Sequence, residues 1–195
     1  MGWLGPDQSV RLGRYLIARA QPGDAAAYAL ADAQMVSATY AYTMPPEFEQ
    51  QRLGEVNDVA DQLRQQFAAD LDRERSGAEP ARRTWIAWDN SEVAGIAVSA
   101  GETPQWEREL GVAPVDGITH QLNHLYLRPA HHGAGLGQAL LDLALPGRMR
   151  AYLWLVGGNS RAERFYARNG FETDPVTYSC GPLWFNKPLY RMYRR

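Results

Sequence analysis

A glycine-rich loop at residues 131–137 separates an apolar run from a helical pattern, an order that could bind an anion. The apolar run, residues 122–127, has strand character and stops before Pro129, since proline cannot donate to a sheet ladder. Leucines recur at helical spacing over residues 136–145. The free N–H groups of a first helical turn and the helix dipole attract anions, and glycines let a phosphate approach the backbone. The sequence therefore predicts an anion site in this loop.

The loop lacks the residues of the two commonest nucleotide motifs. A P-loop requires Gly-Lys-Ser/Thr at its end, whereas Gly137 is followed by Gln138 and Ala139. A dinucleotide-binding fingerprint requires a third glycine at position 138. Neither motif is present, and a tight turn without a ligand stays open as the alternative.

The spacing of His132, Gly135 and Gly137 resembles motif A of the GNAT acyltransferases, Arg/Gln-x-x-Gly-x-Gly/Ala. The Leu-Tyr-Leu-Arg-Pro strand end before the loop is also similar to that family. His132 stands where Arg or Gln is usual, but the resemblance implies that backbone amides hold most of the pyrophosphate of coenzyme A. It assigns cofactor binding to Leu125, Tyr126, Leu127, His132, Gly133, Ala134, Gly135, Leu136 and Gly137.

Residues 151–171 resemble motif B of the same family. The pattern predicts a buried strand, then a short helix with Asn159 or Ser160 as its N-cap and Asn169-Gly170 as a left-handed C-cap. The resemblance implies that Asn159 bonds the amides of the pantetheine arm. Similarity at the level of motifs covers roughly residues 120–173.

The resemblance also implies a mechanism in which an amine attacks the acetyl thioester directly. Tyr166, by its position in motif B, would be the general acid that protonates the departing thiolate. A tyrosine with a pKa near ~10 can do so because the thiolate becomes basic as the C–S bond breaks. The alternative is that Tyr166 is a core aromatic on an amphipathic helix.

The general base is less evident, because Gln121 and Asn123 stand where many GNAT enzymes carry Glu or His. Neither side chain accepts a proton near neutral pH. We expect them to orient a water or the amine, while the proton passes through water to bulk solvent or to a carboxylate such as Glu47. A strand bulge could turn His124 toward the acceptor, but His124 is interpreted here as a structural histidine.

The resemblance places the acceptor mouth between the first two helices and the loop joining the last two strands. The residues assigned to substrate binding there are Tyr40, Glu47, Tyr178 and Trp184. Aromatic walls with a carboxylate would suit a cationic amine. The alternative for each residue is a role in packing.

Two further features could suggest other chemistry. His131 and His132 are adjacent, but neighbouring histidines on a loop cannot easily share one ion without a third ligand, so no metal site is expected. Cys180 could be a nucleophile, yet no patterned His–Asp partners accompany it, so an incidental thiol is expected.

The composition of the 195 residues is that of an ordinary globular domain, with 45% hydrophobic and 22% charged residues. A net charge of −2 argues against nucleic-acid binding, and we expect neither a membrane span nor a signal peptide, because no apolar run is long enough and arginines interrupt the first apolar stretches. One cysteine fits a reducing cytoplasm. A homodimer stays open.

The elements that must position these residues have a mixed α/β order. We expect a GNAT fold with a central sheet of about seven strands and about four helices, splayed between its fourth and fifth strands. The whole chain, 1–195, is expected to form one domain with a loose N-terminal arm at 1–12. Strands are expected near 15–20, 84–89, 93–100, 122–127, 152–156, 171–173 and 189–193, and helices near 24–42, 56–71, 136–145 and 160–168.

Two functions follow from the resemblance. The favoured one is an acetyl-CoA-dependent N-acetyltransferase that acts on a primary amine of a small molecule or peptide. The other is a catalytically quiet GNAT-fold module that binds acyl-CoA for regulation. Tyr166 with a workable proton acceptor would distinguish the first from the second.

Overall fold

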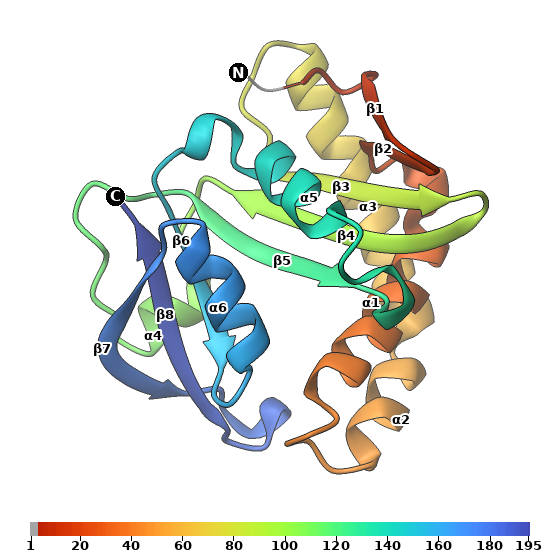
Figure 1. The fold of residues 1–195 in the computed structure, drawn as a ribbon. Helices are drawn as coiled ribbons and strands as arrows, with labels where there is room; N and C mark the ends of the chain where they lie inside the picture. The colour runs from red at the N-terminus through yellow and green to blue at the C-terminus, as the bar shows by residue number, and fades with distance from the viewer. Residues whose placement is uncertain (1–3) are drawn as a thin grey trace. The chain divides into compact units, whose positions relative to one another are not determined.

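The computed structural model describes residues 4–195, apart from the side chain of Leu183, and shows a mixed α/β chain (Figure 1). Short 3-10 turns, each beginning at a proline, lie at 22–24, 129–131, 146–148 and 182–184. The strands are β1 (Ser9–Leu12), β2 (Tyr15–Arg19), β3 (Arg82–Asp89), β4 (Glu92–Ala100), β5 (Gln121–Leu127), β6 (Ala151–Val156), β7 (Glu172–Ser179) and β8 (Pro188–Arg194). The helices are α1 (Ala25–Tyr40), α2 (Glu47–Gly54), α3 (Val56–Arg75), α4 (Gln105–Glu109), α5 (Leu136–Ala144) and α6 (Ser160–Arg168).

Within the described residues the strands form one sheet of eight, in the order β1-β2-β3-β4-β5-β6-β8-β7. The mixed α/β class predicted from the sequence is confirmed, with one strand (β1) and two helices (α2 and α4) more than expected. β5 and β6 are parallel, in the register Gln121↔Tyr152 and Leu122↔Leu153, at the beginning of both strands. The splay farther along these strands stays a prediction.

The chain forms two compact units, which are described separately. The first runs through Ser99 and resumes at His124–Gly147, and the second consists of Ala100–Asn123 and Arg148–Arg195. The expectation of one domain over residues 1–195 stays a prediction. No helix among residues 4–195 combines the length and the apolar character needed to cross a bilayer.

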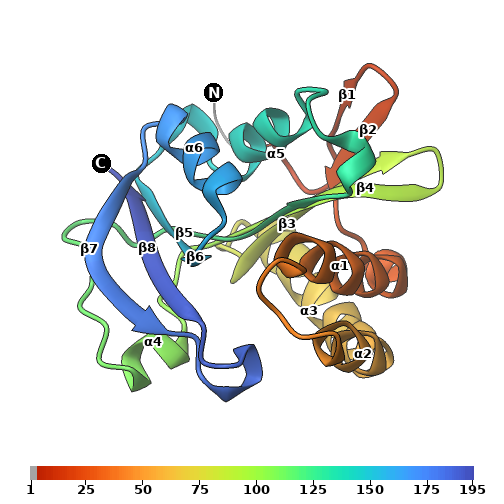
Figure 2. The same cartoon turned by 60° about the horizontal axis from the view of Figure 1, so that its bottom comes forward.

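In the first unit, helices cover both faces of the strands. α1 and α3 lie on one face of β3 and β4, and α5 lies on the other (Figures 1 and 2). The core under α1 and α3 is apolar, and its largest members are Tyr28, Met35, Phe67, Ile86 and Ile96. Under α5, a Cβ on Gly95 would meet Leu140 at 3.0 Å, so this glycine allows α5 to pack closely on β4.

The alanine-rich helix α1 is buried over most of its surface, and Ala33, Val36 and Tyr40 are among its buried residues. Leu30 is an exception, because its side chain is 42% exposed. Leu30 follows the buried Tyr28 by two positions, which is about 200° around the helix, so it faces solvent.

The N-terminal segment is more ordered than the expected loose arm at 1–12. Residues 9–12 form β1, which pairs antiparallel with β2 from Ser9↔Ala18 to Leu12↔Tyr15. Gly13, with φ of 55°, makes the tight turn of this hairpin. The prediction of an arm is therefore wrong for residues 9–12, while residues 1–3 lie outside the described part of the chain.

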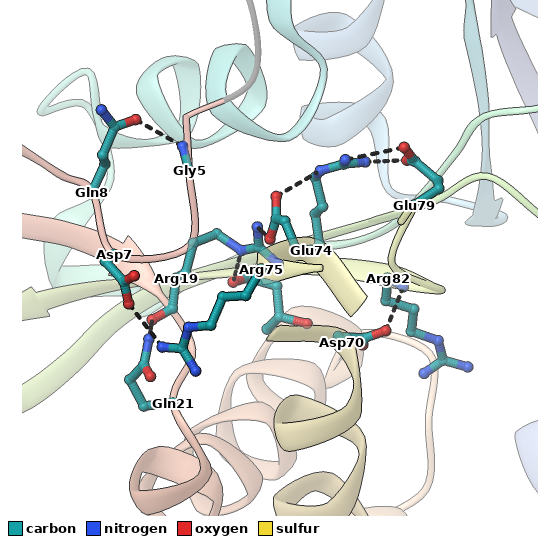
Figure 3. Close-up of polar contacts among 12 residues, drawn as sticks. Gly5, Asp7, Gln8, Arg19, Gln21, Asp70, Glu74, Arg75, Glu79 and Arg82 are labelled. Carbon is teal, nitrogen blue, oxygen red and sulfur yellow. Dashed lines mark hydrogen bonds and ion pairs between the residues drawn. The ribbon is translucent and has the colours of Figure 1, made fainter. Parts of the chain in front are cut away.

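A network of charged residues lies near the end of α3, and two of its members, Arg19 and Arg83, are buried. Arg19 is 3% exposed, and its guanidinium donates to Glu74 at 2.5 Å (Figure 3). Glu74 also contacts Arg83 at 3.4 Å, and Arg83 pairs with Glu79. The network fixes α3 against β2 and β3, since buried charges remain stable only when paired.

The second unit is built on β6, which pairs antiparallel with β8 along its whole length, from Ala151↔Arg194 to Val156↔Leu189. β7 completes this edge and runs to Ser179, well beyond the strand expected at 171–173. α6 and α4 lie on opposite sides of these strands (Figure 2). On the α4 side, the Trp154 ring of β6 meets the Trp106 ring edge to face at a centroid distance of 5.4 Å.

Candidate active site

The 132–137 loop leads directly into α5. Residues 132–135 are exposed, and Gly135 is the N-cap of the helix in a left-handed conformation, with φ of 77°. Gly133 also has a positive φ, 81°. The Ala139 N–H donates to the Gly135 carbonyl at 3.1 Å, so the amides before it belong to the first turn, which has no intrahelical acceptors. This geometry suits an anion.

The two histidines of the loop have different surroundings. His131 is buried, and its Nδ1 lies 3.1 Å from the Tyr15 hydroxyl and 3.2 Å from the Arg14 guanidinium. His132 is exposed. The contacts of His131 therefore connect the loop to β2. Within residues 4–195, no cluster of three or more His, Cys, Asp or Glu side chains could hold a metal ion.

Leu125, Tyr126 and Leu127, to which the resemblance assigns cofactor binding, are half-buried at the end of β5. The Tyr126 hydroxyl lies 3.4 Å from that of Tyr40 on α1, and the rings meet edge to face. Tyr40, which was predicted to bind substrate, is buried beside this strand end, with 4% of its surface exposed.

A buried carboxylate of the first unit faces the same strand. Asp32 on α1 accepts a hydrogen bond from Arg52 of α2 at 2.9 Å through Oδ2. Its Oδ1 lies 3.4 Å from Nδ1 of His124 and has no hydrogen bond among the described residues. The Tyr28 hydroxyl lies 3.3 Å from the same Nδ1. The imidazole is therefore held from one side, by α1.

The pKa values in this cluster follow from burial and charge. Burial alone would raise the pKa of Asp32, but the imidazole of His124 and the Arg52 guanidinium together hold that pKa below its ordinary range. Burial, and then the Asp32 carboxylate, raise the pKa of Tyr28 well above its ordinary value. Asp32 is thus an anion at neutral pH and Tyr28 a neutral phenol.

The second unit contains a different buried carboxylate, Glu107 on α4. It accepts hydrogen bonds from the Trp154 indole at 2.8 Å and from the Tyr152 hydroxyl at 3.1 Å. The Gln121 amide donates to it at 3.3 Å, and the Asn123 amide in turn donates to Gln121 Oε1 at 2.8 Å. Gln121 and Asn123, predicted to orient water or the amine, thus belong to one network ordered by Glu107.

Burial raises the pKa of Glu107, against the opposing effect of hydrogen bonds from Trp154 and Tyr152 and of the Arg191 charge. Burial and the carboxylate raise the pKa of Tyr152 far above its ordinary range. The Asn123 Oδ1 is buried without a hydrogen-bond partner among the described residues. It is a buried acceptor that the described residues leave unsatisfied.

Sequence reasoning missed both Glu107 and Asp32 as site residues. Asp32 carries a signal in hindsight, because it is the one charged residue of α1 and follows Tyr28 by one helical turn. Glu107 carries none, since it lies in an irregular stretch among other polar residues. Both matter because they orient residues of β5.

Motif B has the predicted caps. The Asn159 side chain accepts from the Ala162 N–H at 3.1 Å as the N-cap of α6, and Gly170 is left-handed after the helix, with φ of 82°. Tyr166 is the buried residue of α6, with its ring 5.6 Å from that of Phe171. The cofactor role of Asn159 and the catalytic role of Tyr166 stay predictions.

The other predicted acceptor residues lie in separate units. Glu47 is exposed in the first turn of α2, in the first unit. In the second unit, the Tyr178 ring meets Trp154 edge to face at 5.2 Å, and Trp184 lies half-buried in the turn at 182–184. Their roles in binding an acceptor stay predictions.

Cys180 has the properties of an incidental thiol. Burial raises its pKa to about 11, so the thiolate needed by a nucleophile is scarce at neutral pH.

A profile of the acetyltransferase (GNAT) domain matches residues 80–173, which contain β5, the 132–137 loop, β6 and α6. This match identifies residues 80–173 as a domain of the GNAT superfamily. Uncharacterised N-acetyltransferases of Mycobacterium tuberculosis and Mycobacterium bovis are 40% identical to it over 57 residues, which span 27% of this chain and 36% of each relative.

Solved structures share the GNAT fold over almost the whole chain. The PaiA N-acetyltransferase of Thermoplasma acidophilum, in complex with coenzyme A, aligns with a TM-score of 0.64 at 16% identity, covering 93% of this chain and 98% of that one. The ribosomal-protein-S5-alanine acetyltransferase of Vibrio fischeri aligns with a TM-score of 0.59 at 9% identity, covering 96% of each. At these identities, the likeness concerns the fold alone.

Proposed function

We propose that this chain is an acetyl-CoA-dependent N-acetyltransferase that acts on a primary amine of a small molecule or peptide. The observation that carries the proposal is the exposed 132–137 loop, with its left-handed glycines, at the N-terminus of α5 inside the GNAT match. The names of the mycobacterial relatives and the coenzyme A bound to the Thermoplasma protein support it. A cytoplasmic location and a homodimer are further predictions.

The cofactor contacts follow the two motifs. The amides from Gly133 to Gly137 bind the pyrophosphate, and the backbone of Leu125 and Leu127 bonds the pantetheine arm as an additional strand would. Asn159 already uses Oδ1 to cap α6, so its amide N–H₂ group is what it offers to a pantetheine carbonyl.

The chemistry is a direct transfer. The amine nitrogen forms a bond to the acetyl carbon, the C–S bond breaks, and Tyr166 donates its proton to the departing thiolate. Asn123 supports this proposal with its buried, unpartnered Oδ1, which can accept a hydrogen bond from a water. Gln121 holds Asn123 in place. Tyr40, Glu47, Tyr178 and Trp184 bind the acceptor.

A substitution in the loop tests cofactor binding. Gly135→Val places a β-branched side chain at a φ of 77° and beside the proposed phosphate, so we expect acetyl-CoA affinity to fall by about a hundredfold or more. Gly77→Val is the matched control, because Gly77 has a φ of 82°, follows the C-terminus of α3 as Gly135 precedes the N-terminus of α5, and likewise has nothing within 4 Å of an added Cβ.

Calorimetric titration with acetyl-CoA measures both variants against the parent protein. Circular dichroism shows whether each remains folded. Equal losses of affinity in folded Gly135→Val and Gly77→Val would contradict a phosphate site at the loop, because backbone strain alone would then explain the effect.

A further inference from the structure

The cluster of Asp32, Tyr28 and His124 has the geometry of a proton acceptor. We infer that His124 is the general base of acetyl transfer and that Asp32 is the residue that positions it. This inference rests on the proposed function. It replaces the sequence-based interpretation of His124 as a structural histidine and of bulk water or Glu47 as the proton acceptor.

The contacts of His124 are one-sided. Its Nδ1 faces Asp32 Oδ1 at 3.4 Å and the Tyr28 hydroxyl at 3.3 Å, and its ring meets Tyr126 edge to face at a centroid distance of 5.7 Å. No described residue makes a hydrogen bond to Nε2, and the side chain is 39% exposed. The second ring nitrogen is therefore open to a ligand.

Asp32 selects the useful tautomer. Its Oδ1 is buried and lacks a hydrogen bond, which is unfavourable for a carboxylate oxygen. A proton on Nδ1 of His124 is attracted to this oxygen across 3.4 Å, and the Tyr28 hydroxyl can accept from the same N–H. With Nδ1 protonated, Nε2 carries the lone pair that a general base needs.

Asp32 is itself held in the charged state. Arg52 donates to its Oδ2 at 2.9 Å and, with the imidazole, keeps its pKa low. The groups that face the imidazole are thus the Asp32 carboxylate, backed by Arg52, and the phenols of Tyr28 and Tyr126. An anion opposite Nδ1 stabilises the imidazolium that forms when Nε2 takes a proton.

The place of His124 in the chain fits this role. It directly precedes Leu125 on β5, whose backbone is proposed to bond the cofactor arm. Strand alternation puts Tyr126 on the same face as His124, toward α1. His124 therefore lies on the strand proposed to bind the cofactor, next to Leu125.

The other candidates fit the role less well. Glu107 is 3% exposed and accepts from Trp154, Tyr152 and Gln121, so an acceptor amine has little access to it. Glu47 is exposed on α2, and no described residue makes a hydrogen bond or ion pair with its carboxylate.

Two residues account for the proton transfers of the reaction. His124 Nε2 removes a proton from the amine as the C–N bond forms, and Tyr166 protonates the thiolate as the C–S bond breaks. The products are an N-acetyl amide and free coenzyme A thiol. The imidazolium then loses its proton to solvent, and the tyrosinate regains one.

The test compares His124→Gln, Asp32→Asn and the control His120→Gln in the full chain. The readout is the release of thiol from acetyl-CoA with an amine that the parent protein acetylates, measured as kcat/KM against pH. For the parent we expect an acidic limb, because the base must be unprotonated. His124→Gln should lower kcat by about a hundredfold or more and remove that limb.

Asp32→Asn should lower kcat by about tenfold or more and move the limb, with the KM for acetyl-CoA unchanged, because the base is misoriented and the cofactor is not. His120→Gln should leave rate and limb as they are. An unchanged limb in folded His124→Gln would overturn the inference while leaving the proposed function intact. A parent protein that binds acetyl-CoA but acetylates no amine would instead overturn the proposed function, and the inference with it.

Discussion

Two buried carboxylates, one in each compact unit, hold residues of the same strand in different ways. Asp32 is paired with the cation Arg52 and leaves one oxygen facing a half-exposed imidazole. Glu107 is surrounded by neutral donors, Tyr152, Trp154 and Gln121. One oxygen of Asp32 therefore still lacks a hydrogen bond, whereas Glu107 accepts from all three donors.

The pKa shifts of the two acids have opposite directions for that reason. A cation and an imidazole hold the pKa of Asp32 below its ordinary value, while burial among neutral donors raises that of Glu107. A buried acid can thus orient a proton acceptor only if charged partners keep it ionised. Asp32 meets this condition, and Glu107 serves to hold Gln121 and Asn123 in position.

Substitution of Tyr166, in the second unit, has the larger expected effect. Tyr166→Phe should lower kcat about ten- to a thousandfold, because the thiolate loses its proton donor, while acetyl-CoA affinity stays as it is. If the acid and the base are separate groups, the acidic limb assigned to His124 should persist in this variant. Steady-state rates against pH and calorimetric titration check both expectations.

Tyr193→Phe is the control for Tyr166→Phe, since it removes one hydroxyl from β8 of the same unit. Equal rates for the parent and Tyr166→Phe would make Tyr166 a packing residue against Phe171.

A smaller effect concerns stability against pH. The pKa of Asp32 in the folded chain lies below its ordinary value of 3.8. At a pH between the folded and unfolded pKa values, the unfolded chain therefore binds more protons at this residue than the folded chain. Asp32 therefore contributes stability above about pH 4 that is lost as the pH falls. The pKa of Glu107 in the folded chain lies above its ordinary value of 4.5. Its contribution to the stability of the fold therefore falls as the pH rises from 4.5 through the folded-state pKa.

Urea denaturation of Asp32→Asn and Glu107→Gln from pH 3 to pH 7 measures these contributions. The free energy of unfolding of Asp32→Asn should be lower than that of the parent at neutral pH and approach it as the pH falls. The free energy of unfolding of Glu107→Gln should rise relative to that of the parent as the pH increases toward neutral. Parallel curves for the two variants would mean that the two carboxylates are equivalent, and the comparison between them would fail.

Elements with a strong local pattern could be predicted from the sequence. The 84–89 and 93–100 hairpin, the caps of α6 and the strand–loop–helix at 122–145 depend on turn residues and periodicity within a few positions. β1 and α2 were missed because their short segments carry weak patterns. β1 is defined by its pairing with β2, which is a tertiary effect.

The candidate site could be predicted only where a motif carries it. The loop glycines and Asn159 adopt the expected conformations. The partners of β5 could not be predicted, because Asp32 and Glu107 are distant from His124 and Gln121 in sequence, and the fold alone brings them together. The strand pattern around His124 therefore indicated only a structural role for this residue.

Release of free thiol from acetyl-CoA in the presence of a panel of amines tests acetyl transfer most directly. With the purified chain and each amine in turn, we predict thiol release that requires both protein and amine, with a matching amount of N-acetylated product by mass spectrometry. Gly135→Val should abolish the release at the same cofactor concentration. Binding of acetyl-CoA without amine-dependent thiol release from any member of the panel would contradict this account and favour a catalytically quiet module that binds acyl-CoA.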